Sequence, residues 1–144
     1  MPEPEVTLSS ERVYEGRRVV VRVEQVRLAS GVEGTREVIE VPACVVIVAV
    51  DADHTVLLVR QYRKAPQVEL LELPAGALEP GEQPIDAAQR ELREETGYAA
   101  AELTEIGAFY SAPGLLTEMM HAFLARGLTH DPLPADSDEQ IALE

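Results

Sequence analysis

The segment GALEPGEQPIDAAQRELREETGY, residues 76–98, is the feature that most constrains the fold of this chain. Pro84 suits the first position of an α-helix and Gly97 the position just beyond its last turn, so the sequence predicts one helix between them. Three apolar residues recur at helical spacing: Ile85, Ala88 and Leu92. We expect these three to form the buried stripe of the helix.

Glutamates crowd the face beside this stripe. At about 100° per residue, Glu91, Glu94 and Glu95 fall within an arc of roughly 100°, and Glu82 lies just before the helix. Like charges at this spacing destabilise a helix by about 0.2–0.5 kcal/mol per pair, and the chain already carries a net charge of −14. Clustered carboxylate oxygens are the ligands that Mg²⁺ and Mn²⁺ prefer. The alternative is a solvated acidic face, which is commoner among glutamate-rich helices.

Most of the remaining chain is predicted to be β-structure. Strands are expected over residues 6–14, 18–28, 35–41, 43–50, 55–63, 102–110 and 119–125. The continuously apolar run 43–50 is typical of a central strand buried on both faces, and DADH after it favours a hairpin turn. A loop is expected over residues 129–139, and another element begins at residues 141–143. The pattern predicts an α+β domain with a mixed sheet and few helices.

Composition and charge exclude several classes of protein. The 46% hydrophobic and 26% charged residues are typical of a globular protein. A pI of about 4.5 argues against a nucleic-acid partner, which requires a basic surface. No apolar run approaches the roughly 20 residues of a membrane span, and residues 1–10 lack the basic and apolar regions of a signal peptide. We therefore expect a cytoplasmic protein without a membrane partner. The single cysteine, Cys44, excludes an intrachain disulfide and is expected to be buried.

The acidic helix resembles a known motif. Residues 76–98 fit the pattern G-x5-E-x7-R-E-U-x-E-E-x-G-U, in which U is a bulky aliphatic residue, and this pattern resembles the Nudix box. The matching residues are Gly76, Glu82, Arg90, Glu91, Leu92, Glu94, Glu95 and Gly97. Tyr98 departs from it, because Ile, Leu or Val is usual there. The resemblance implies a Nudix-type α/β/α sandwich with a mixed sheet and N-terminal antiparallel strands, and metal-dependent hydrolysis of a nucleoside diphosphate linked to another group.

The resemblance also implies roles for individual residues. Glu91 and Glu95 are expected to be the principal ligands of Mg²⁺ or Mn²⁺, with Glu94 as a further ligand or as the group that positions water. The carbonyl of Ala75 is expected to join them. The remaining box residues have orienting or backbone roles: Gly76, Glu82, Arg90 and Gly97.

Features outside the box resemble the ADP-ribose pyrophosphatase subfamily. A proline, Pro113, follows Gly97 by sixteen residues, and VRQYR (59–63) and TREVIEVPACVVI (35–47) resemble the segments ahead of the box. By this resemblance Arg63 contacts the diphosphate. The other expected substrate contacts are Pro113, Gly114 and Leu115 beside the terminal ribose, Glu118 behind them, and Tyr98.

The subfamily further implies a homodimer with exchanged N-terminal strands, in which Arg36 and Glu37 of one chain reach the adenosine site of the other. Residues 1–41 are then a β-rich dimerisation and substrate region, and residues 42–144 the Nudix domain. A late acidic loop, within 134–143, is expected to bring Glu139 over the metals, with Asp136 and Asp138 nearby. A solvated acidic loop is the alternative. Compared with the family, the chain is expected to be shortened at its C-terminus.

Three functions remain open on the sequence. The first is Mg²⁺-dependent hydrolysis of ADP-ribose or a related ADP-sugar to AMP and a sugar phosphate. The second is a Nudix hydrolase of another nucleoside diphosphate derivative or of an oxidised nucleoside triphosphate. The third is a non-catalytic domain that binds ADP-ribose; such domains usually lose glutamates of the box, whereas this chain keeps them.

Overall fold

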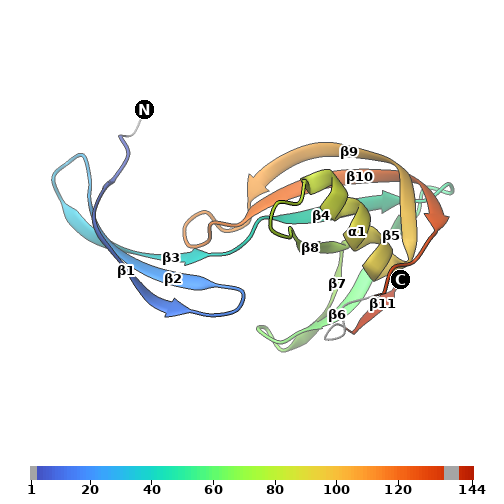
Figure 1. Ribbon diagram of the computed structural model, residues 1–144, viewed down its shortest axis with the longest axis horizontal. Helices are drawn as coiled ribbons and strands as arrows, with labels where there is room; N and C mark the ends of the chain where they lie inside the picture. The colour runs from blue at the N-terminus through green and yellow to red at the C-terminus, as the bar shows by residue number, and fades with distance from the viewer. Residues whose placement is uncertain (1–2, 135–139) are drawn as a thin grey trace. The chain divides into compact units, whose positions relative to one another are not determined.

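The computed structural model describes residues 3–134 and 140–144, and the chain divides into two compact units (Figure 1). One unit comprises Met1–Pro42 and Tyr110–Met119, and the other Ala43–Phe109 and Met120–Glu144. Within the described residues there is one helix, α1, and the rest of the regular structure is β.

The N-terminal unit is a three-stranded antiparallel sheet with the order β1 (Val6–Glu15), β2 (Val20–Arg27) and β3 (Glu33–Glu40). The loop after β9 belongs to this unit, because the Ile39 N–H donates to the Leu115 carbonyl at 2.9 Å and the Thr117 N–H donates to the Ile39 carbonyl at 3.1 Å. All of β1 is exposed. Val26 is the one buried apolar residue among the described residues of this unit.

The second unit holds the core. Its larger sheet has the order β5 (Val56–Leu57), β4 (Cys44–Val50), β10 (Met119–His130) and β9 (Tyr98–Tyr110), and β8 (Ala75–Ala77) also pairs with β4. The β4–β10 pair is parallel and the β4–β5 and β4–β8 pairs are antiparallel, so the sheet is mixed. A smaller antiparallel sheet has the order β11 (Ile141–Leu143), β6 (Val59–Arg63) and β7 (Val68–Glu72).

Helix α1 (Pro84–Thr96) packs on β4 and β8 (Figure 1). The core is formed by buried residues of α1, β4 and β10: Val45, Ile47, Ala49, Ala87, Ala88, Leu92, Phe123 and Ala125. Cys44 is buried beside them in β4, as expected. Of the predicted apolar stripe, Ala88 and Leu92 are buried, but Ile85 is 49% exposed. The prediction for Ile85 was wrong: Ile85 lies in the first turn of the helix, and Ala87 is the third buried apolar residue of α1 beside Ala88 and Leu92.

The α+β class with a mixed sheet and N-terminal antiparallel strands is confirmed. Three local expectations were wrong. The predicted strand 55–63 is interrupted at Leu58, and its two parts, β5 and β6, join different sheets. The sequence patterns did not reveal β7 or β8, and β10 continues to His130, one residue past the start of the predicted loop.

Candidate active site

The ends of α1 follow from its terminal residues. Pro84 occupies the first turn, and Gly97 follows the last turn in the left-handed conformation at φ 78°, donating its N–H to the Arg93 carbonyl at 3.1 Å. A positive φ at this position favours glycine. Because Leu92 and its apolar neighbours face the core, the adjacent Glu91 is drawn inward with them and is only 8% exposed. A carboxylate buried to this extent requires partners.

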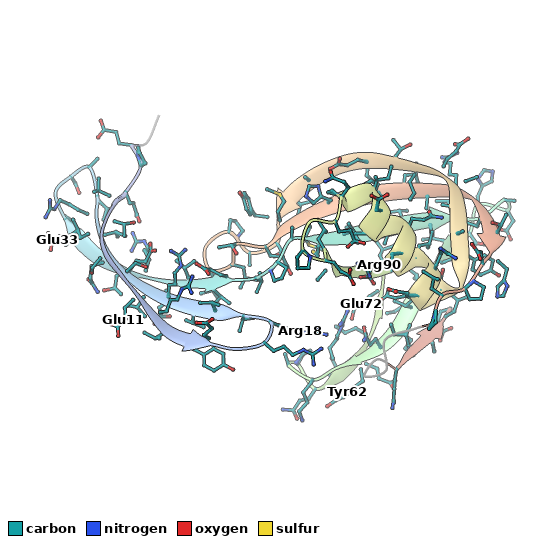
Figure 2. The ribbon with its side chains drawn as sticks, viewed as in Figure 1. Glu11, Arg18, Glu33, Tyr62, Glu72 and Arg90 are labelled. Atoms are coloured by element: carbon teal, nitrogen blue, oxygen red, sulfur yellow. The ribbon has the colours of Figure 1, made fainter. Side chains whose placement is uncertain are left out.

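Arg90 supplies those partners (Figure 2). Its Nε and Nη2 donate to the two carboxylate oxygens of Glu82, each at 2.9 Å. Its Nη1 donates to Glu91 at 2.7 Å and to Glu94 at 3.0 Å, and Nη2 also donates to the Ala77 carbonyl at 3.1 Å. One guanidinium thus joins the segment before α1, the helix face and β8.

The network favours the charged forms of Glu82 and Arg90. The hydrogen bonds from Arg90 are the largest reason that the pKa of Glu82 is lowered from its ordinary value, and they outweigh the opposing effect of burial. The same interaction raises the pKa of Arg90 above its ordinary value. The guanidinium therefore relieves part of the repulsion between neighbouring glutamates.

Strand β8 approaches the glutamates closely. The Ala75 N–H donates to Glu95 Oε2 at 3.0 Å. At Gly76, a Cβ atom would overlap the carboxylate of Glu91. Gly76 is therefore required by the close approach of the strand to the helix. The role expected for the Ala75 carbonyl stays a prediction.

The residues Glu91, Glu94 and Glu95 offer only oxygen donors, which suits a hard divalent ion. No three His, Cys, Asp or Glu side chains within residues 3–134 and 140–144 converge closely enough to hold an ion by themselves. Mg²⁺ does not need an all-protein cage, because it usually keeps several waters and shares substrate phosphates. The three glutamates therefore fit such an ion in two respects. All of their donor atoms are oxygens, and Gly76 allows β8 to approach them closely.

A cavity of about 510 Å³ adjoins two of these glutamates. Its lining residues are Arg60, Tyr62, Glu69, Glu94, Glu95, Gln140, Ile141 and Ala142. Arg63, the arginine expected to contact the diphosphate, instead forms a two-point ion pair with Glu72, at 2.8 and 2.9 Å. These bonds are the largest cause that lowers the pKa of Glu72 from its ordinary value.

The expected substrate residues of the N-terminal unit come together in that unit. Arg36, Glu37 and residues 113–115 line one cavity of about 620 Å³. Arg36 Nε also donates to Glu5 at 3.0 Å. Glu118 is half-buried next to this loop, and its carbonyl accepts a hydrogen bond from Ser111 at 3.3 Å.

One expected substrate residue, Tyr98, lies outside the two cavities. Tyr98 opens β9 and packs edge-on against His130, with ring centroids 5.7 Å apart. Glu139 lies outside the described residues, as do Asp136 and Asp138. Sequence reasoning missed Arg60, Glu69 and Glu72. Strand alternation in VRQYR carried a signal for Arg60, since it places Arg60 and Arg63 on opposite faces.

Comparison with known proteins identifies the family. The family described as NUDIX domain matches residues 40–144, and the one described as nucleoside diphosphate sugar hydrolase N-terminal domain matches residues 5–39. The chain belongs to the Nudix family. It is a Nudix hydrolase, and hydrolases of this family generally use a divalent metal ion.

Relatives and a solved structure agree with this assignment. The chain is 40% identical to an ADP-ribose pyrophosphatase of Bacillus subtilis over 95% of this chain and 75% of that protein. It is 36% identical to a methanol dehydrogenase activator of Bacillus methanolicus over 94% of this chain and 73% of that protein. A crystal structure of an ADP compounds hydrolase, 28% identical, superposes with a TM-score of 0.88 and covers 100% of this chain and 78% of that one. The Nudix-type fold is thereby confirmed. None of the described helices is both long and apolar enough to cross a membrane.

Proposed function

We propose that this Nudix hydrolase cleaves the pyrophosphate bond of ADP-ribose, with Mg²⁺, to give AMP and ribose 5-phosphate. The observation that carries the proposal is the glutamate face of α1, held by Arg90, in a chain 40% identical to an ADP-ribose pyrophosphatase. In the reaction one water oxygen bonds to one phosphorus, and the bridging oxygen leaves with the other phosphate. The water's two protons are shared between the products and solvent.

Glu91 and Glu95 would hold the divalent ion, and Glu94 would be a further ligand or would orient the attacking water. When bound, such an ion neutralises phosphate oxygens and lowers the pKa of water. Arg90 acts indirectly, by fixing the carboxylates of Glu91 and Glu94. The buried position of Glu91 limits its motion, so the face is organised before substrate arrives.

A substrate panel tests the proposal. The purified chain is incubated with Mg²⁺ and, separately, ADP-ribose, other ADP-sugars and an oxidised nucleoside triphosphate, and the products are separated by anion-exchange chromatography. We expect ADP-ribose to have the highest kcat/KM and to yield AMP. A higher kcat/KM for the triphosphate would reject the assignment, and binding of ADP-ribose without turnover would indicate a non-catalytic domain.

We infer also that the chain acts as a homodimer through its N-terminal unit. The support is that β1 exposes apolar side chains along its length: Val6, Leu8, Val13 and Tyr14 are 60%, 41%, 53% and 57% exposed. A second copy is a natural cover for such a surface. Light scattering on the intact chain and on a variant with Val13→Lys tests this: the intact chain should have twice the monomer mass, and the variant a lower one.

A further inference from the structure

The cavity beside Glu94 and Glu95 has a second wall, which is formed by residues of the smaller sheet. Arg60 and Tyr62 come from β6, and Glu69 comes from β7. Tyr62 lies opposite Glu69 in the register, and Arg60 lies opposite Ala142 of β11. Residues opposite one another in antiparallel strands share a face of the sheet. The four residues therefore form one continuous surface, which ends at Glu94 and Glu95 of α1.

Arg60 is the sole positive charge among the described residues that line this cavity, whereas Glu69, Glu94 and Glu95 are negative. The whole chain carries a net charge of −14, so an anionic substrate meets repulsion that a local cation has to offset. Arg63 lies on the opposite face of the same strand and is already engaged with Glu72. Arg60 is thus the arginine of VRQYR that borders the cavity.

The present partner of Arg60 is easily replaced. Arg60 Nε pairs with Glu144 at 2.9 Å, and the two side chains are 44% and 47% exposed. Exposed pairs of this kind contribute only about 0–1 kcal/mol, because both charges remain hydrated. A phosphate, with several charged oxygens, competes well for a guanidinium. Two residues along the strand, Tyr62 is 51% exposed and offers an aromatic ring next to that charge.

We propose that Arg60 and Tyr62 form a substrate-binding wall, in which Arg60 binds a phosphate of the diphosphate and Tyr62 packs on the ring that this phosphate carries. The inference rests on the proposed function and adds specificity-determining residues to it. Arg60 has to exchange Glu144 for the substrate, so Glu144 competes with the phosphate. The same chemistry fits either half of ADP-ribose, since AMP and ribose 5-phosphate each pair a phosphate with a ring.

Steady-state kinetics with matched variants test the wall. Arg60→Gln should raise the KM for ADP-ribose about tenfold or more, with kcat within about twofold, because the contact exists in both ground and transition states. Arg126→Gln is the control: Arg126 is another exposed arginine of the same unit, bordering a different cavity, and its KM should not change. Glu144→Gln should lower KM two- to threefold. Tyr62→Ser should raise KM as well, because it removes the ring that packs on the substrate.

Binding of the two products shows which half of ADP-ribose contacts the wall, and the measurement does not require turnover. Inorganic phosphate, AMP and ribose 5-phosphate are titrated into the intact chain and into Arg60→Gln, with the tyrosine ring signals followed by NMR. Weaker binding of AMP or of ribose 5-phosphate by the variant supports the wall and identifies the half that occupies it. Equal binding of both products by the two proteins, or equal KM changes in Arg60→Gln and Arg126→Gln, would overturn it. If the intact chain fails to hydrolyse ADP-ribose, the proposed function fails, while these titrations still decide the wall.

Discussion

Two arginine–glutamate groups in different regions of the molecule differ in how far water reaches them. Around α1, Arg90 binds Glu82, Glu91 and Glu94, whose side chains are 14%, 11% and 21% exposed. In the N-terminal sheet, Arg27 pairs with Glu33 at 2.9 Å, but those side chains are 52% and 58% exposed. Water screens the second pair and is largely kept from the first. Burial, and not the count of ion pairs, distinguishes an organised site from a charged surface.

The apolar residues repeat this contrast. The second unit closes its core with fully buried residues such as Leu92 and Val45, each 0% exposed. In the N-terminal unit Val26 is the buried apolar residue among those described, and cross-strand pairing joins β1, β2 and β3. The N-terminal sheet therefore gains less stability from apolar burial within its own unit, whereas the second unit is stabilised by a buried apolar core.

The largest expected effect is on catalysis. Glu95→Gln removes one charge from the glutamate face but keeps an oxygen that can accept the Ala75 N–H, so the fold should persist. We expect kcat for ADP-ribose to fall at least about 100-fold, because the remaining donors bind a divalent ion and orient water poorly. Steady-state rates and far-UV circular dichroism measure both results. Glu102→Gln, at an exposed position on β9, is the control and should retain full activity. A near-normal rate for Glu95→Gln would show that Glu95 is not part of the site.

The next effect is on stability, and it compares the two units directly. Leu92→Ala leaves a cavity in the core and should lower the free energy of unfolding by about 2–5 kcal/mol. Val32→Ala, just before β3 and outside β1, removes a side chain that is 61% exposed and should change the free energy of unfolding by less than about 0.5 kcal/mol. Urea denaturation of both variants and of the intact chain measures the difference. Comparable losses of stability in the two variants would contradict the difference in burial between the two units.

The smallest effect is a pH dependence of the Arg90 network. The folded-state pKa of Glu82 lies below its ordinary value of 4.5, so its contribution to stability is complete above that value and is lost as the pH falls through the lower, folded-state pKa. The stability gap between the intact chain and Glu82→Gln should therefore be largest near neutral pH and should close in acid. Glu33→Gln, which breaks an exposed pair, should show little gap at any pH. If the stability gaps of Glu82→Gln and Glu33→Gln changed with pH in the same way, the contrast between the two regions would be contradicted.

Much of the fold and of the site could be predicted from local patterns. Pro84, Gly97 and the 3.6-residue period located α1 and its glutamate face, and the apolar run 43–50 located the central strand β4. Short strands were harder: β8 has three residues, Ala75–Ala77, and its pairing with β4 is a long-range contact without a local signature. Ile85 was misjudged because periodicity gives the direction of a side chain and not where the packed part of a helix begins.

The sequence by itself determined the chemistry of this protein: the oxygen donors, their order on one helix, and the membership of a family of hydrolases. Only the tertiary structure decided which groups meet those donors. It placed Gly76 against Glu91, engaged Arg63 with Glu72, and left Arg60 at the cavity. The physical reason is that a helix face follows from local backbone geometry, whereas strand pairing brings together residues whose separation along the chain no local pattern records.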